Sequence, residues 1–234
     1  MIVWGTKLDR RPELSRLFSI SRPIEEIVAH FGVNLSSVAS VPSETVEGTP
    51  GLIVLEKDGL RLLKSPTWGF PRQTGEMRHN GEPPGRIGLV ADLTNPLWDR
   101  LVVDAKYRCL IVLTHFANPD GVKGSKTRTW FSLNRQPLIA WAGFCRNTPE
   151  FGPVFAGMTM KANEKIRPLN DRMPVLLEPE EYERWLHGSI EDIIAFQYRE
   201  PPPSDEFAVL KTRDRWQSGT PPSKASRRRD DVLS

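Results

Sequence analysis

The chain has 234 residues, of which 38% are hydrophobic and 26% are charged, as in an ordinary globular protein. It has no apolar run of the roughly 18 residues that a membrane helix needs, and charges within its first thirty positions argue against a secretory signal. Its two cysteines exclude a disulfide scaffold or a cysteine-rich zinc module, so we expect a cytoplasmic protein without a membrane association. Lys plus Arg exceed Asp plus Glu by 32 to 29, which permits a nucleic-acid partner without requiring one.

The first half of the chain holds three segments with clear local signals. Residues 23–32 place apolar side chains at helical spacing between a proline and a glycine, which predicts a short amphipathic helix. Residues 52–57 and 60–64 flank Asp58-Gly59, and this turn dipeptide predicts a β-hairpin. Residues 66–87 are rich in Pro, Gly and charge, which predicts a long surface loop.

The second half of the chain predicts strands followed by helices. Asn95-Pro96 begins a short helix, and the expected strands are residues 109–116, 127–133, 138–144, 154–160 and 173–177. Helices are expected at 178–186 and 189–197, the second opened by a capping box of Ser189 and Asp192.

The predicted fold class is α+β, a mostly antiparallel β domain with barrel-like packed sheets and short peripheral helices. We expect this single domain to span residues 1–200. Residues 201–234 are polar and rich in proline, which predicts a C-terminal tail that is largely disordered.

Most sequence motifs that would identify a reaction on their own are absent. The chain has no phosphate-binding glycine loop, no HExxH and no GxSxG, and its four histidines form no local metal motif. We therefore expect no metal and no cofactor. His115, at the end of a predicted buried strand, is the one histidine that could join a site, although a hydrogen-bonded structural role is the simpler interpretation. Cys109 and Cys145 lie in apolar stretches that predict packed thiols.

Cations near aromatic residues indicate a surface for nucleic acid, because cations bind phosphate and aromatic faces stack on bases. The candidates come from the segment around Trp130 and from the predicted long loop. They are Trp68, Arg72, Lys123, Lys126 and Arg128. The alternative is that these residues are a solvated loop and core tryptophans.

Several short motifs occur in an order that is characteristic of one family. The most specific are Asp171-Arg172-Met173-Pro174-Val175 and Tyr182-Glu183-Arg184-Trp185-Leu186, preceded by Ala162-Asn163-Glu164, Trp130-Phe131, Arg108-Cys109-Leu110, Pro96-Leu97-Trp98 and Trp68-Gly69. This ordered set resembles the SOS response-associated peptidase (SRAP) family of abasic-site processing proteins, over roughly residues 39–186.

The resemblance implies a mostly β domain whose basic groove binds single-stranded DNA that carries an abasic site. In that family, removal of the initiator Met exposes a cysteine whose amine and thiol capture the sugar aldehyde as a thiazolidine. A glutamate, a histidine and an Asn/Arg pair place the amine, the phosphate and the transferable protons.

This chain departs from the family at each of these positions. Ile2 follows the initiator Met, Leu89 and Ala91 stand where the family has Asn and Arg, Asn118 replaces the glutamate and Asn170 replaces the histidine. An amide cannot act as a general base. No catalytic residue is therefore predicted, and we expect a degenerate member that at most binds single-stranded or abasic DNA, as a monomer, on the nucleoid if it binds DNA at all.

Two alternatives stay open. The chain could be an active crosslinking enzyme and autopeptidase whose start codon is misassigned, although a new start would not restore the internal residues. It could instead be a protein-interaction scaffold that uses its Pro-rich loop or tail and has no role on DNA. A mass spectrum of the purified protein separates the active enzyme from the degenerate member. Salt dependence of DNA affinity identifies the interaction protein, because phosphate contacts give a steep slope.

Overall fold

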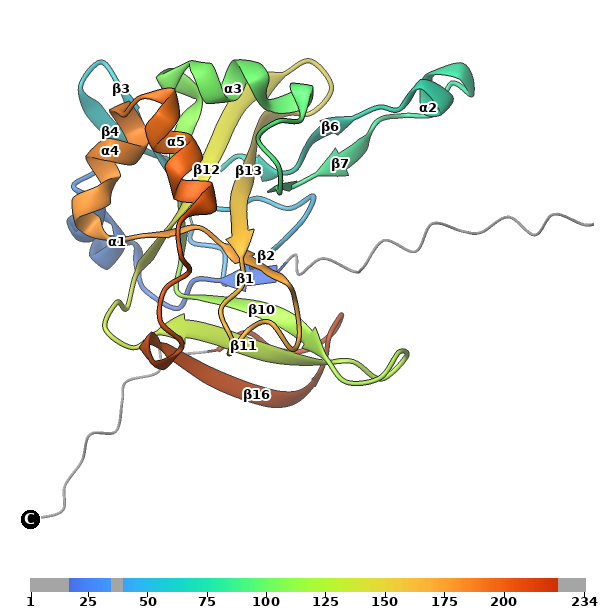
Figure 1. Ribbon diagram of the computed structural model, residues 1–234, viewed down its shortest axis with the longest axis vertical. Coiled ribbons are helices and arrows are strands. Elements are labelled where there is room, and N and C mark those ends of the chain that lie inside the picture. Colours follow the sequence, from blue (N-terminus) through green and yellow to red (C-terminus); the bar gives the residue numbers. More distant parts are fainter. Residues whose placement is uncertain (1–16, 35–39, 223–234) are drawn as a thin grey trace, which may run out of the picture.

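The computed structural model describes residues 17–34 and 40–222, and these residues form two large sheets packed on each other (Figure 1). The five-stranded sheet has the order β16-β11-β10-β1-β2, with β1 Leu17–Ser19, β2 Glu44–Val46, β10 His115–Asp120, β11 Thr127–Leu133 and β16 Phe207–Arg215. The nine-stranded sheet has the order β14-β13-β12-β9-β3-β4, with β3 Ile53–Lys57, β4 Leu60–Lys64, β9 Arg108–Leu113, β12 Ile139–Thr148, β13 Gly152–Lys161 and β14 Arg172–Pro174.

Three short strands complete the nine-stranded sheet, namely β5 Thr67–Trp68, β8 Leu89–Val90 and β15 Leu176–Leu177. Among the pairings of the described strands, only those of β13 with β5 and β8 are parallel. The α+β class with mostly antiparallel sheets is therefore confirmed. The described sheets stay open, so "barrel-like" applies to their packing and not to a closed barrel.

Short helices lie around the sheets (Figure 1). They are α1 Ile24–Phe31, α2 Gly75–His79, α3 Asp99–Val103, α4 Tyr182–His187 and α5 Ile190–Tyr198, with 3-10 turns η1 Pro96–Trp98, η2 Ala105–Tyr107, η3 Pro179–Glu181 and η4 Ser204–Glu206. In the described parts of the chain, no helix has the length and apolar character needed to cross a membrane.

Local signals explain the elements that the sequence predicts correctly. Helix α1 buries Ile27 and Phe31 and ends at Gly32, whose φ of 61° is the left-handed conformation that glycine adopts without strain. In the turn between β3 and β4, Asp58 and Gly59 have φ values of 53° and 71°, which fit the right-handed twist of a two-residue hairpin.

The predicted strand 109–116 is in fact two strands that belong to different sheets. Thr114 separates β9 from β10, and its backbone N–H and its hydroxyl both donate to the carbonyl of Ser19 in β1, at 2.8 and 3.1 Å. The Thr114 hydroxyl also accepts a hydrogen bond from the N–H of Ser21. These bonds hold the chain where it leaves the larger sheet and enters the smaller one.

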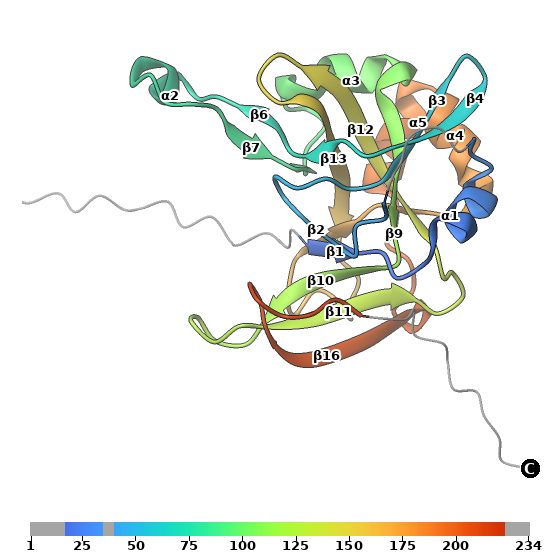
Figure 2. The ribbon, with the colours of Figure 1, turned by 180° about the vertical axis from the view of Figure 1, so that it is seen from behind.

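The expectation of an irregular loop at residues 66–87 is wrong. The segment contains β5, then β6 Phe70–Arg72 and β7 Gly85–Ile87, which pair with each other and carry α2 at their end. Both views show this pair as an arm that projects from the body (Figures 1 and 2). Its pairing places Phe70 opposite Ile87, a long-range contact that composition does not reveal.

The expected tail at residues 201–234 is also partly wrong, because Phe207–Arg215 forms β16, an edge strand. Leu133 of β11 lies opposite Phe207, which is 2% exposed and packs edge-on against Phe116 with 6.4 Å between ring centroids. Burial of this aromatic ring and pairing with β11 offset the entropy cost of ordering the segment. Residues 223–234 lie outside the described residues.

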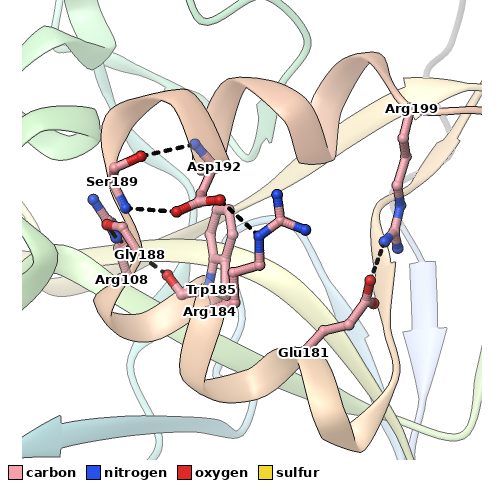
Figure 3. A network of polar contacts seen from close by, with 8 residues as sticks. All are labelled: Arg108, Glu181, Arg184, Trp185, Gly188, Ser189, Asp192 and Arg199. Atoms are coloured by element: carbon pink, nitrogen blue, oxygen red, sulfur yellow. Dashed lines mark hydrogen bonds and ion pairs between the residues drawn. The ribbon is translucent and has the colours of Figure 1, made fainter.

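Hydrogen bonds and ion pairs hold helices α4 and α5 in position, as Figure 3 shows. The buried Arg108 donates to the carbonyls of Trp185 and Gly188, at 3.3 and 2.6 Å. The predicted capping box is present, since Asp192 N–H donates to the Ser189 hydroxyl at 3.2 Å and Ser189 N–H donates to the Asp192 carboxylate at 2.9 Å. These bonds occupy the free backbone groups between the two helices.

An aromatic cluster joins the two sheets. Phe18 lies 5.1 Å from Trp68 and 6.0 Å from Trp141 between ring centroids, and Trp68 stacks on Phe155 at 6.2 Å. Gly157 makes room for this cluster, because a Cβ atom there would lie 2.0 Å from the Trp141 ring.

Candidate functional site

A small pocket of about 40 Å³ lies between the two sheets, and we call it the intersheet pocket. Its walls come from β1 and β10 of the smaller sheet and from β5, β8, β12, β13 and β14 of the larger one, together with the segment before β14. The lining residues are Leu17, Trp68, Leu89, Ala91, Phe116, Ala117, Asn118, Trp141, Thr159, Asn170, Arg172, Met173 and Pro174.

The structure brings together the four internal positions at which the chain departs from the SRAP pattern. Leu89, Ala91, Asn118 and Asn170 come from separate segments, and all four line the intersheet pocket. Ile2, the fifth such position, lies outside the described residues. An alkyl group, a methyl group and two amides therefore occupy the pocket where the resemblance places Asn, Arg, Glu and His.

A chain of hydrogen bonds sets the orientation of the two amides. The Asn170 carbonyl oxygen accepts from the backbone N–H of Arg172 at 3.1 Å, so the Asn170 amide nitrogen faces Asn118 and donates to its Oδ1 at 3.3 Å. Asn118 is 1% exposed, and its Nδ2 has no hydrogen-bond partner within the described protein. The pocket thus contains a buried donor that a ligand oxygen could accept from.

Arg172 is the sole ionisable residue among the described residues that line the pocket. Its Nε donates to the Thr159 hydroxyl at 3.2 Å and its Nη2 donates to the Ala91 carbonyl at 2.7 Å. Burial lowers the pKa of Arg172, yet an arginine still stays protonated and cannot accept a proton at neutral pH. The described pocket can therefore bind through hydrogen bonds but offers no general base.

His115 lies near the pocket without lining it. It is 2% exposed, its Nδ1 shares a 2.9 Å hydrogen bond with the Thr114 hydroxyl, and its ring packs edge-on against Trp130. Burial lowers the pKa of His115 to about 4, so the ring is neutral at pH 7. These contacts support the structural interpretation of this histidine.

Trp68 and Arg128, two of the predicted nucleic-acid contacts, are buried. Trp68 is 1% exposed and donates its indole N–H to the Gly88 carbonyl at 2.7 Å. Arg128 is 2% exposed, pairs with Glu44 at 2.5 Å and donates from Nε to the Trp216 carbonyl at 3.0 Å. Arg128 is therefore not available to a phosphate, and Trp68 faces only the intersheet pocket.

Lys123 and Lys126 lie instead on an open surface of the β10–β11 hairpin. Together with Arg215 and Trp216 they line a hollow of about 470 Å³, which we call the basic rim. The Trp216 N–H donates to the Lys126 carbonyl at 2.9 Å and holds the end of β16 beside the hairpin. Arg215 and Trp216 were missed by sequence reasoning because they fall in the expected tail. The apolar start of β16, with Phe207 ahead of its charged end, was the available signal.

Arg72 lies on β6, half-buried, in the projecting arm and apart from the basic rim.

Cys109 and Cys145 are buried, and burial raises the pKa of the Cys109 thiol well above its usual range. Neither of these thiols can serve as an exposed nucleophile.

One cluster holds residue types that bind metals. Glu56, Glu183 and His187 place ligand atoms within 4.8 Å of one another. His187 Nε2 lies 3.2 Å from a Glu56 oxygen, and the Arg61 guanidinium pairs with Glu183. The same guanidinium also lies 3.9 Å from Glu56, so Arg61 contacts both carboxylates and the contacts form an ion-pair network.

Comparisons with known proteins agree with the fold. The family model described as SOS response associated peptidase (SRAP) matches residues 18–215. This range includes β16 and begins after Ile2. The search against curated proteins returned no match.

Solved structures of bacterial proteins are similar to this chain. A protein from Bordetella bronchiseptica is 18% identical with a TM-score of 0.69, covering 84% of this chain and 99% of its own. A protein from Bacteroides thetaiotaomicron is 16% identical with a TM-score of 0.67, covering 83% and 90%. A phage-related protein from Bordetella bronchiseptica is 18% identical with a TM-score of 0.64, covering 88% and 100%. At these identities the similarity demonstrates a shared fold.

Proposed function

Because the chain belongs to the SOS response-associated peptidase family, we propose that it binds single-stranded DNA and forms no covalent bond to it. The observation that carries this proposal is the composition of the intersheet pocket. Leu89, Ala91, Asn118 and Asn170 meet there, and none of them can transfer a proton at neutral pH.

The positions of the two cysteines support the same proposal. Capture of an abasic-site aldehyde as a thiazolidine needs an amine and a thiol on one residue at the chain's start. The printed sequence has two cysteines, Cys109 and Cys145, and both are buried in strands.

Noncovalent binding has its own support. The Asn118 amide N–H inside the intersheet pocket lacks an acceptor, and a sugar or phosphate oxygen of DNA could supply one. Lys123, Lys126 and Arg215 offer exposed or half-exposed cations to the phosphates on the basic rim. The interior and the rim would then contribute different parts of one binding surface.

Fluorescence anisotropy tests the proposal with a labelled single strand, with and without an abasic site, at about 50 and 200 mM salt. We expect salt-sensitive binding by the wild-type protein. The double variant Lys123→Gln/Lys126→Gln should lower the slope of log affinity against log salt by about 1.4, since each phosphate contact on a single strand contributes about 0.7.

The double variant Arg100→Gln/Arg135→Gln is the matched control, because it removes two exposed charges away from the basic rim. It should leave the slope unchanged. Absence of DNA binding at low salt would overturn the proposal and favour the protein-interaction alternative.

A further inference from the structure

The edge of the intersheet pocket at β13 and β14 carries two cations on one face of the sheet. Thr159 and Arg172 line the pocket, and Lys161 lies directly opposite Arg172 in the pairing of the two strands. Lys161 is also two residues beyond Thr159 on β13, so its side chain leaves the same face as that of Thr159. We call the edge formed by Ala91, Lys161 and Arg172 the pocket mouth.

The two cations of the pocket mouth differ in their partners. Arg172 donates to the Ala91 carbonyl at 2.7 Å, and its pKa is lowered by burial while the charges of Asp171 and Asp92 oppose that shift. Lys161 is exposed, and its ammonium forms no hydrogen bond or ion pair with the described residues. Like charges directly opposite each other also destabilise a strand pair. A phosphate at Lys161 would relieve this repulsion.

An exposed aromatic ring lies at the Ala91 end of the pocket mouth. Gln197 donates to the carbonyl of Val90 at 3.3 Å, which holds the last turn of α5 beside the segment that contains Ala91. Tyr198, the last residue of α5, is 66% exposed, and no other aromatic ring of the described chain packs against it. Burial lowers the pKa of Arg172, and the Tyr198 hydroxyl is among the groups close enough to oppose that shift.

The size of the pocket decides which parts of a DNA strand could enter it. Its volume of about 40 Å³ is far below the roughly 300 Å³ of the smallest typical small-molecule sites, so a base has to stay outside. Outside, Tyr198 offers a free ring face. Proteins that bind single strands combine cations for the phosphates with aromatic rings for the bases.

An extended strand fits this arrangement better than a small anion does. Lys161 and Tyr198 belong to different ends of the pocket mouth, and successive nucleotides of one strand can contact them separately. A small anion would bind at Lys161 and leave the Tyr198 ring unused.

We propose that single-stranded DNA runs across the pocket mouth, with Lys161 binding a backbone phosphate and Tyr198 stacking on a base. The inference rests on the DNA binding proposed above and adds a surface to it, since neither residue lines the basic rim. Both side chains are exposed, so substitutions should change DNA binding and leave the fold intact.

Salt dependence of anisotropy with a labelled single strand tests the phosphate contact. Lys161→Gln should lower the slope of log affinity against log salt by about 0.7, the contribution of one phosphate contact on a single strand. Lys161→Arg keeps the charge and should keep the slope. Lys57→Gln is the matched control, because it removes an exposed lysine from β3, three strands away from β13, and it should leave the slope unchanged.

The same measurement tests the stacking contact through affinity at constant salt. Tyr198→Ala should weaken binding roughly 5- to 150-fold and leave the salt slope unchanged, because stacking on a base involves no phosphate charge. Tyr198→Phe keeps the ring and should keep the affinity. Leu60→Ala, which removes an exposed apolar side chain from β4, should have no effect.

The outcomes separate this proposal from the proposed function. An unchanged slope in Lys161→Gln or an unchanged affinity in Tyr198→Ala would overturn the proposal while wild-type DNA binding persists. An equal loss of slope in Lys57→Gln would also overturn it, because the effect would then be one of net charge. Absence of DNA binding by the wild-type protein would overturn both.

Discussion

The surroundings of Arg128 and Arg146 differ although both arginines lie on strands and beside an aromatic ring. Arg128 is 2% exposed, with its guanidinium 5.8 Å from the Trp130 centroid, and it bonds to Glu44 and to the Trp216 carbonyl. Arg146 lies 5.6 Å from the Phe70 centroid, and its buried Nε has no partner in the described structure.

The difference separates an arginine whose nitrogens all bond within the protein from one that keeps an unsatisfied donor. Arg128 links β11 to β2 and to the end of β16, and its polar atoms are occupied by the protein. Arg146 keeps a buried Nε that no group in the described structure accepts from. Hydrogen-bond satisfaction, and not proximity to an aromatic ring, thus distinguishes the two arginines.

The largest effect is expected at Trp68. Its side chain is buried and its indole N–H has an acceptor within the protein, as the guanidinium of Arg128 does. Trp68→Ala should lower the free energy of unfolding by about 3–5 kcal/mol, because the indole is 1% exposed and packs on Phe18 and Phe155. Urea unfolding measures this change. Trp68→Phe should cost clearly less, and equal losses in the two variants would contradict a packing role.

The next effect concerns His115, which packs on the same Trp130 ring as Arg128. Its folded-state pKa of about 4 lies below the ordinary value of 6.5, so its contribution to stability is complete above pH 6.5 and is lost as the pH falls to about 4. The loss over this window should approach about 3 kcal/mol. Urea unfolding of wild type and His115→Gln at several pH values measures it, and parallel pH profiles would contradict the assignment.

A third prediction compares the two arginines directly. Arg128→Met should destabilise the protein by about 3 kcal/mol, since Glu44 loses its partner in a largely buried pair. Arg146→Met should not lower the free energy of unfolding, because it removes a buried donor that has no partner in the described structure. Equal destabilisation in chemical denaturation would show that Arg146 also serves the fold.

Much of the fold could be predicted from local signals. The helix at residues 23–32, the hairpin at Asp58-Gly59 and the capping box at Ser189 depend on neighbours within a few positions, and the structure contains all three. Strand β16 and the arm formed by β6 and β7 depend on pairing with distant segments. Composition alone therefore pointed to a tail and a loop in their place.

The candidate site was less accessible from the sequence. Its four internal positions were identified only through the family resemblance, and their convergence in one pocket needed the structure. Arg128 looked like a phosphate contact because Glu44, its partner, lies 84 residues away in the sequence. Arg146 gave no signal, because an unsatisfied hydrogen bond is a property of three-dimensional packing.

The most direct test of the central claim is a covalent trapping experiment. The protein is incubated with a single strand that carries an abasic site, denatured, and its intact mass is determined; a hydroxylamine probe confirms that the aldehyde is reactive. We expect the mass of the protein alone, from a sample in which anisotropy detects a native complex. A species heavier by the mass of the DNA strand would contradict it.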